Sequence, residues 1–449
     1  MTSLHRSLAV FLLLAFCILG SVESADALPA FARKYGLRCS ACHEAWPMLN
    51  YFGQKFKDNG YQLMNDRDAP IWQNNGYWPV TFRITPNWHR ESVNKVPTDQ
   101  SPTGQQEINT QGFDLSGLDF HTGGTLEKNI SFYVLPSSDA TGAFHFETVM
   151  ARLDNLLGSS WLNFKLGKFE LDNLVSEKRI LLLSGQGGFY QIYHFIPVGD
   201  ANIFGQIGDN QLGVELMGHS YNDRTRYSAA LISSTDGNVN QLYGNAYSGF
   251  FTASQAFDAG KLGVQRIGAY AMVGQAPVAY LTAAGAVIPG SGTSFRPFNR
   301  EGFVGQFYFG KLDVQVVTQH GWDSAWFGAG YGDTPDGGLN GLNMTLPANA
   351  RAPSWNGAFV ETHYVVNPQL ILIQKSEWVR MSQQALPTNA SNLGNVDNYT
   401  FGYRWYPIMT SRAGFAWFQE YGWTRQRGTA VDGTDITASS LIGGFDFDF

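Results

Sequence analysis

Residues 441–449, which end the chain, read LIGGFDFDF, and this stretch decides the fold. When alternate residues are assigned to opposite sides, Phe445 and Phe449 fall on one side, and Asp446 and Asp448 fall on the other. A period of two is typical of a β-strand with one apolar and one polar face. The stretch therefore predicts a terminal strand that separates an apolar environment from a polar one.

The same alternation recurs upstream as far as Pro79, and no long stretch of helical periodicity interrupts it. We predict strands at residues 79–90, 111–121, 129–136, 142–153, 160–169, 209–220, 225–234, 245–257, 262–274, 301–310, 312–322, 354–366, 369–381, 398–407, 411–424 and 437–449. That is about 16 strands, an even number as in bacterial β-barrels. The fold class is therefore all-β, an antiparallel outer-membrane β-barrel.

The connections between these strands fall into two classes by length. Long connections are expected at residues 91–110, 170–208, 275–300, 323–353, 382–397 and 425–436. Short ones are expected near Asp223, Ala259-Gly260, Gly310-Lys311, Asn367-Pro368 and Pro407. Outer-membrane barrels have short periplasmic turns and long external loops, whereas a soluble sandwich gives no reason for this asymmetry. The even strand count places both ends of the barrel on the periplasmic side.

The composition agrees with a barrel and excludes several other classes. Charged residues make up 15% of the 449 residues and aromatic residues 14%, with 50 glycines, a mean hydropathy of −0.18 and a net charge of −7. These values argue against a helical membrane protein, a disordered chain and a nucleic-acid-binding protein. Tryptophans fall mostly near predicted strand ends, where an aromatic girdle belongs, at Trp78, Trp88, Trp322, Trp326, Trp378, Trp405 and Trp423.

The N-terminus reads as a secretory signal peptide. Basic residues His5 and Arg6 precede a short apolar run, and the small residues of Ala25-Asp26-Ala27 predict cleavage after Ala27. The chain then divides into residues 1–27, the signal peptide; 28–78, a small helical segment; and 79–449, the barrel. Cys17 lies in the apolar run and is lost with it.

The two remaining cysteines stand in the sequence Cys39-Ser40-Ala41-Cys42-His43. This spacing is the attachment motif of one covalent haem c, in which Cys39 and Cys42 bind the macrocycle and His43 is the proximal iron ligand. A redox dithiol and half of a zinc site are the competing interpretations. No βαβ pattern surrounds the motif, and no further Cys or His lies near it, so haem is favoured over both.

The distal iron ligand stays open. Met64 follows a predicted helix and lies far enough along the chain to return over the haem, so it is one candidate metal ligand. The opposing interpretation gives Met64 a purely packing role. Met48 is five residues from His43, which we judge too close to reach the opposite face. His89 and an open sixth position complete the set of candidates.

The rest of the small segment predicts a short helix. Pro47 suits a first helical position, Leu49, Phe52 and Phe56 share one face, and Asn59-Gly60 is a stop signal. So short a segment builds little core alone and needs the haem or the barrel as a packing partner. Insertion into the barrel or tight docking is therefore favoured over a domain that hangs free.

Two loop regions suggest further roles. The connection 170–208 is long enough to fold inward, where the charged residues Glu170, Asp172, Glu177, Lys178 and Arg179 would line a pore; a solvated outer loop is the alternative. Acidic residues of predicted outer loops, Asp323, Asp333 and Asp336, would attract Fe(II), although acidic loops also serve solubility.

The terminal strand with its final Phe resembles the last strand of bacterial outer-membrane barrels. Residues 29–64 resemble the fused monohaem cytochrome–porin family of iron-oxidising bacteria. The resemblance rests on the runs Pro29-Ala30-Phe31-Ala32-Arg33-Lys34-Tyr35-Gly36, Cys39-Ser40-Ala41-Cys42-His43, Pro47, Leu49-Asn50, Phe52-Gly53, Phe56-Lys57 and Asn59-Gly60-Tyr61.

The resemblance implies an iron:cytochrome c oxidoreductase of the bacterial outer membrane. Such a protein takes electrons from extracellular Fe(II) and passes them through the haem to a periplasmic c-type cytochrome. Two competing functions share the barrel: a general electron conduit for another donor, and a diffusion porin in which the haem is a plug. Haem attachment is a costly maturation for a plug, which disfavours the porin.

Overall fold

The structure is a computed structural model. It describes residues 30–45, 48–65, 68–73, 79–98, 101–138, 142–176, 181–186, 188, 190–194, 207–208, 210–233, 247–279, 293–324, 352–382, 395–410, 413–428, 430 and 432–449. No helix among these residues is both long and apolar enough to cross a membrane.

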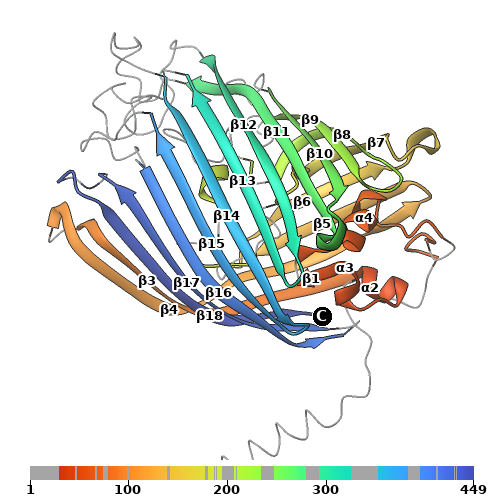
Figure 1. The fold of residues 1–449 in the computed structure, drawn as a ribbon, viewed down its shortest axis with the longest axis horizontal. Helices are drawn as coiled ribbons and strands as arrows, with labels where there is room; N and C mark the ends of the chain where they lie inside the picture. Colours follow the sequence, from red (N-terminus) through yellow and green to blue (C-terminus); the bar gives the residue numbers. More distant parts are fainter. Residues whose placement is uncertain are drawn as a thin grey trace, which may run out of the picture.

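Sixteen antiparallel strands form a closed barrel in which each strand pairs with the next along the chain and β18 pairs with β3 (Figure 1). Their bounds are β3 Val80–Thr98, β4 Ser101–Glu127, β5 Ile130–Ser138, β6 Phe144–Leu153, β7 Asn163–Glu170, β8 Asn210–His219, β9 Thr225–Ser233, β10 Tyr247–Asp258, β11 Val264–Ala279, β12 Thr293–Phe309, β13 Leu312–Asp323, β14 Ser354–Asn367, β15 Leu370–Met381, β16 Asn395–Met409, β17 Gly414–Arg427 and β18 Ile436–Asp448. The predicted all-β barrel is confirmed, and every predicted strand overlaps one of these.

The barrel has an apolar outside and a charged inside. Phe303 and Phe401 are 71% and 57% exposed, whereas Arg300, Lys375 and Arg404 have no exposed surface. The last strand follows the same rule, since Phe445 and Phe449 are exposed while Asp446 and Asp448 are buried. A barrel in water would place these groups the other way round. The inversion is the layout of a transmembrane barrel.

The two ends of the barrel differ as the sequence predicts. The short connections lie at one end, the short-turn end, together with the C-terminus (Figure 1). One predicted loop is wrong: residues 91–110 belong almost entirely to the long hairpin of β3 and β4, whose strands run to Thr98 and from Ser101. Where strands extend beyond the membrane both faces meet water, so the apolar half of the alternation disappears from the sequence.

Aromatic rings close the seam between the last and first strands. Phe449 exchanges two backbone hydrogen bonds with Phe82, at 2.9 and 3.0 Å, and their rings stack with centroids 5.3 Å apart. The row continues to Phe120 on one side and to Phe447 on the other. Of the predicted girdle tryptophans, Trp322, Trp378, Trp405 and Trp423 lie within the last five residues of their strands, Trp88 lies mid-strand, and Trp78 and Trp326 fall outside the described residues.

The N-terminal segment, residues 30–65, contains helices α2 Ala30–Tyr35, α3 Cys39–Cys42 and α4 Tyr51–Asp58, and the short strands β1 His43–Ala45 and β2 Met48–Leu49. The helix predicted from Pro47 begins only at Tyr51, where Asn50 caps it by accepting a hydrogen bond from the Gly53 amide at 2.9 Å. Leu49 pairs with His43 in a strand, and Phe52 is 40% exposed. The predicted apolar face of this helix is therefore wrong in two of its three positions.

This segment lies in the short-turn end of the barrel. Lys34 donates a hydrogen bond to Thr125 of β4 at 3.0 Å, and Gln315 of β13 donates one to the sulfur of Met48 at 3.3 Å. β4 and β13 are almost opposite each other in the strand order. The segment therefore spans the mouth of the barrel, as the sequence favours.

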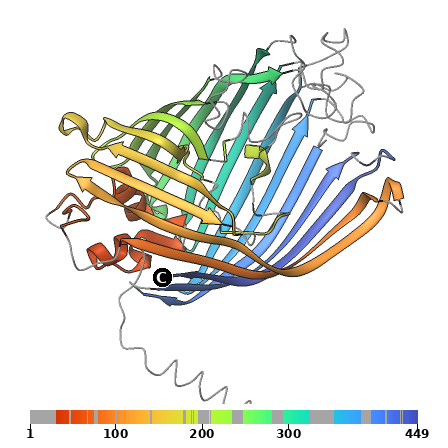
Figure 2. The same ribbon diagram turned by 180° about the vertical axis from the view of Figure 1, so that it is seen from behind.

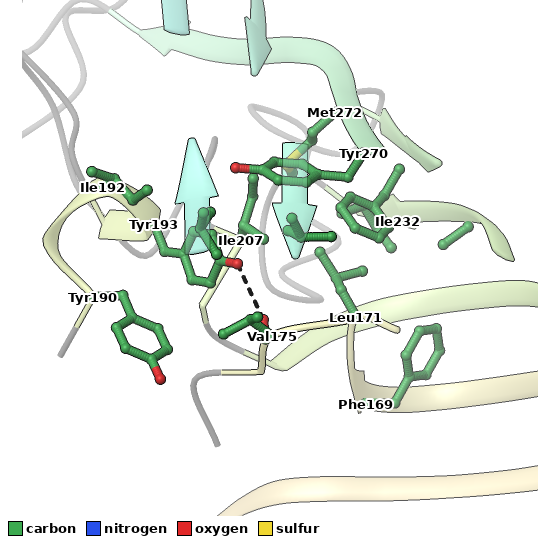
Figure 3. Packing of buried hydrophobic residues seen from close by; sticks show 14 of the residues in the cluster. Phe169, Leu171, Val175, Tyr190, Ile192, Tyr193, Ile207, Ile232, Tyr270 and Met272 are labelled. Atoms are coloured by element: carbon green, nitrogen blue, oxygen red, sulfur yellow. Dashed lines mark hydrogen bonds between the residues drawn. The ribbon is translucent and has the colours of Figure 1, made fainter. Parts of the chain in front are cut away.

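The connection after β7 folds into the lumen, where the helix α5 Gln191–His194 lies (Figure 2). Figure 3 shows its side chains packed against inward-facing strand residues. Leu171, Val175, Tyr190, Ile192 and Tyr193 are at most 2% exposed. Elsewhere, the short helices η1 Leu156–Gly158 and η3 Gly260–Leu262 occupy turns at the short-turn end.

Candidate functional site

The Cys-x-x-Cys-His sequence forms one helical turn and the start of a strand. Cys39 is 6% exposed, and its sulfur lies 3.1 Å from the carbonyl oxygen of Thr410, between β16 and β17. Cys42 is half-buried, and the two thiols form no disulfide. Burial raises the pKa of Cys39 to about 12 and that of Cys42 to about 11. Reactive dithiols need a lowered thiol pKa, so this environment disfavours the redox-dithiol interpretation.

Helix α4 packs directly onto the cysteine turn through Gly53. A Cβ atom at Gly53 would lie 2.0 Å from the carbonyl oxygen of Cys42. Only glycine allows this approach, because any side chain would push α4 away from α3. The same contact brings Tyr51 and Gln54 of α4 to the space beside His43.

His43 lines a cavity of about 620 Å³ between the N-terminal segment and the barrel wall. The cavity walls include Ser40, Glu44, Met48, Leu49, Asn50, Tyr51, Gln54, Leu174, Val175, Ser176, Arg226, Val264, Arg266, Gln306, Tyr308, Gln315, Pro368 and Met409. Its volume is within the range of small-molecule and cofactor sites, roughly 300–1,000 Å³. The lining combines apolar side chains with an at least equal number of polar and charged ones, a mixture that suits a large flat cofactor with a charged edge.

Two arginines bring positive charge to this cavity. Arg226 of β9 forms ion pairs with Asp58 of α4, at 3.0 Å, and with Asp223. Arg266 of β11 donates hydrogen bonds to the carbonyl oxygens of Asp223 and Arg224. Arg266 also lies 4.0 Å from the Asp223 carboxylate, so the two arginines share Asp223 as a partner. The sequence places both arginines on predicted strands but gives no signal for which inward residues share a cavity.

The methionines are distributed unevenly around the cavity. Met64 is 58% exposed and is not among the lining residues, so its predicted ligand role stays a prediction without support from its position. Met48 is 8% exposed and lines the cavity with His43, as does Met409. Sequence spacing argues against Met48 because it does not reveal the pairing of β1 with β2. His89 lies in β3 beside Asn87, away from the lining.

The N-terminal segment is fixed to the barrel by a buried arginine. Arg152 of β6 donates to the carbonyl oxygens of Lys57 and Asp58, at 2.7 and 3.0 Å, at the C-terminal end of α4. Its guanidinium also pairs with Asp154 at 2.7 Å, and both side chains are at most 1% exposed. Positive charge at a helix C-terminus is favourable, so this contact both caps α4 and holds it to the wall.

The inward connection is held by polar residues of the lumen. Glu420 accepts hydrogen bonds from the amides of Leu183 and Ser184, and Glu377 accepts one from Ile192 at 2.8 Å. Of the two alternatives that the sequence left open, the described residues adopt the inward fold, but their side chains form an apolar cluster and not a charged pore lining. Glu170 and Asp172 lie instead near Lys57, at 3.9 and 3.8 Å, and residues 177–179 fall outside the described residues.

The prediction that Asp323 is a cation-attracting loop residue is wrong. Asp323 is the last residue of β13, is fully buried and pairs with Arg300 at 2.9 Å. The strand pattern ends one residue later than expected, which moves the carboxylate from a loop into the lumen. Asp333 and Asp336 fall outside the described residues. Within the described ranges, no group of three or more His, Cys, Asp or Glu side chains is suited to hold a metal ion.

Comparison with known proteins finds similarity in fold. No family model matches the chain, and no curated protein matches it. Among solved structures, an anion-selective porin from Comamonas acidovorans is 11% identical, with 82% of this chain and 98% of that chain covered and a TM-score of 0.49. OmpT of Vibrio cholerae is 11% identical over 83% of this chain and 99% of that chain, with a TM-score of 0.45. The outer-membrane channel DcaP of Acinetobacter baumannii is also 11% identical, over 82% and 96%, with a TM-score of 0.45.

Proposed function

We propose that this chain is an outer-membrane electron-transfer protein that oxidises extracellular Fe(II) and delivers the electron, through one covalently attached haem c, to a periplasmic c-type cytochrome. One observation carries the proposal. The Cys-x-x-Cys-His motif lies inside the mouth of a transmembrane barrel, and His43 lines a cofactor-sized cavity there. The apolar outer face of the barrel supports a location in the outer membrane.

Several side chains fit the proposed cofactor. Cys39 and Cys42, which are not among the lining residues, would hold it through thioether bonds, and His43 would supply the proximal nitrogen. Arg226 and Arg266, which also pair with Asp58 and Asp223, would bind its two propionates. When bound, the haem would supply a group that accepts and donates one electron. Apolar side chains, which include Leu49, Val175 and Val264, form part of the cavity wall. Lower polarity around an iron centre changes its reduction potential.

The position of the site explains why a cytochrome would be joined to a barrel. The apolar part of a bilayer is roughly 30 Å thick, a long distance for electron transfer through lipid. A haem inside the short-turn mouth shortens the distance to a periplasmic partner, whereas an electron from the external side still has to cross the rest of the lumen. Fe(II) itself needs no specific protein ligand, because an outer-sphere donor only has to approach closely. The barrel is then an insulating wall around the cofactor.

Stopped-flow spectroscopy of the purified, oxidised protein tests this function. Mixing with Fe(II) at neutral pH should produce the reduced haem spectrum, and a Cys42→Ala variant should insert into the membrane but lack the covalent haem. Absence of covalent haem in the wild-type protein would exclude the proposal. Haem that stays oxidised with Fe(II) but is reduced by another donor would favour the general electron conduit.

A diffusion porin is the second candidate, favoured by the barrel itself. The inward connection disfavours it, because its buried side chains belong to one apolar cluster with wall residues of strands β9 to β16. Tyr190 stacks on Phe359 of β14 with ring centroids 4.2 Å apart. Tyr193 donates a hydrogen bond to the Val175 carbonyl oxygen at 3.1 Å (Figure 3). Apolar packing of this kind obstructs the passage of hydrated solutes.

A further inference from the structure

The exposed charges around the cavity are mainly positive, although Asp258, which is exposed, lies opposite the lining residue Val264 in the pairing of β10 with β11. Among the described residues within three positions of a lining residue, every exposed charged side chain is a cation: Arg38, Arg224, Lys261 and Lys311. The chain as a whole carries a net charge of −7, so this local excess of positive charge opposes the average. We call these four residues the cationic rim.

The acidic residues close to the cavity do not cancel the rim. Asp223 and Asp313 are 0% and 5% exposed, and Asp58 is 7% exposed and paired with Arg226. Glu44 is half-buried. Buried and paired carboxylates contribute little to the field outside the molecule, whereas exposed side chains dominate it. The exposed Asp258 offsets one of the four rim charges, so the surface beside the cavity stays net positive to an approaching protein.

Exposed apolar side chains lie within the same region. Tyr51, which lines the cavity, is 52% exposed, and Phe52 beside it is 40% exposed. Tyr221 is 90% exposed, and the Lys55 ammonium lies 5.6 Å from its ring centre. Tyr51 also donates a hydrogen bond to the carbonyl oxygen of Asn222 at 2.8 Å, which joins α4 to the turn that carries Arg224. A small apolar centre with a charged edge is the anatomy of a transient protein interface.

We propose that the cationic rim is the docking surface for a soluble electron-transfer protein whose own contact face is acidic. The inference rests on the proposed function for the redox role, and the rim adds the chemistry of the partner. Opposite charges raise the rate of encounter and orient the partner, while the apolar centre lets the two cofactors approach. Such steering changes association rates by about 10- to 1,000-fold and weakens with salt.

Charge reversal in the haem-loaded, full-length protein tests the docking surface. The triple variant Arg224→Glu, Lys261→Glu and Lys311→Glu is compared with wild type after reduction by dithionite, so Fe(II) plays no part. The probes are an oxidised acidic soluble c-type cytochrome and an oxidised basic one. The rate with the acidic cytochrome should fall at least tenfold at low ionic strength, and the difference should shrink at high salt. The rate with the basic cytochrome should not fall.

Lys128→Glu is the matched control, because Lys128 is an exposed lysine between β4 and β5, at the same end of the barrel but away from the cavity. It should leave the rate unchanged; an equal loss in this variant would mean a general charge effect and overturn the proposal. An unchanged rate in the triple variant also overturns it. The proposal is also overturned if the triple variant differs from wild type only in its insertion into vesicles of anionic lipid, because the rim would then contact lipid headgroups.

Binding is measured in parallel, as the affinity of the same acidic cytochrome for immobilised protein. Salt-sensitive binding by wild type that the triple variant lacks supports the docking surface. If this binding is observed without electron transfer, the result counts only against the proposed redox function. Equal binding by wild type and the triple variant overturns the docking surface alone.

Discussion

Replacing Arg152 with methionine should release the N-terminal segment from the barrel. Arg152 donates two hydrogen bonds to carbonyl oxygens at the end of α4, at 2.7 and 3.0 Å, and is 2% exposed. Methionine keeps much of the side-chain volume but donates nothing. The change therefore removes the charged contact between segment and wall without opening a large cavity.

The expected size follows from these contacts. A hydrogen bond from a charged donor contributes about 1.5 kcal/mol at the low end, so two of them contribute about 3 kcal/mol. A loss of about 3 kcal/mol raises the population of the detached segment about a hundredfold, since each 1.4 kcal/mol is tenfold. The unpaired Asp154 in the wall adds a separate cost to the barrel, because breaking a buried ion pair costs about 3–5 kcal/mol.

Limited trypsin digestion measures detachment, because Lys55 and Lys57 lie in α4. Cleavage there should accelerate about a hundredfold in Arg152→Met. The barrel should stay folded, which is checked by the shift in its migration on gels between unheated and heated samples. The double variant Arg152→Met and Asp154→Asn should recover thermal stability, because it removes the buried Asp154 charge. It should keep the fast cleavage, because the hydrogen bonds from residue 152 to α4 are still missing.

Arg380→Met is the matched control. Arg380 also donates to two carbonyl oxygens, of Val379 and Val396, and pairs with Asp397, but it lies in β15 at the long-loop end. It should leave cleavage in α4 unchanged. Wild-type cleavage rates in Arg152→Met would refute the reasoning, since the segment would then be held by other contacts.

Four further measurements check other parts of the structure. Phe449→Ala removes two ring contacts at 5.3 Å and should lower the unfolding free energy in urea by about 1–3 kcal/mol; no change would mean that the seam does not depend on the ring. Met48→Ala should alter the ferric haem spectrum, because Met48 lines the cavity, and Met64→Ala should not; the reverse result would restore Met64 as the ligand. In protein produced without haem, the raised pKa values of Cys39 and Cys42 leave little thiolate at pH 8, so alkylation of the thiols should be slow there. Its rate should rise about tenfold per pH unit up to pH 10, and fast alkylation at pH 8 would contradict the burial of the thiols. Single-channel conductance in planar bilayers should be far below that of an open porin, and large steps would favour the diffusion porin.

The barrel could be predicted because the alternation of apolar and polar residues is visible within each strand by itself. Each strand shows an alternation that lipid outside and polar groups inside impose, as between Phe445 and Asp446. The prediction failed where that contrast ends, in the β3–β4 hairpin beyond the membrane. The attachment motif was also readable, since the spacing of Cys39, Cys42 and His43 is itself the chemical signature.

The rest of the site depends on contacts between distant residues. Arg226 and Arg266 line the same cavity as residues of α4 only because the barrel curves around the helix. The sequence of their own strands gives no sign of this shared position. Met48 enters the cavity through the pairing of β1 with β2, over too few residues to show a period. Asp323 shows the opposite error, in which a plausible loop carboxylate is a buried partner of Arg300.

Electron transfer across a sealed membrane tests the central claim most directly. Proteoliposomes that contain the haem-loaded protein and an oxidised soluble c-type cytochrome trapped inside are mixed with Fe(II) outside. The internal cytochrome should be reduced with wild-type protein and stay oxidised with Cys42→Ala. If both preparations reduce it at the same rate, or if neither does while the wild-type protein carries its haem, the proposed pathway is contradicted.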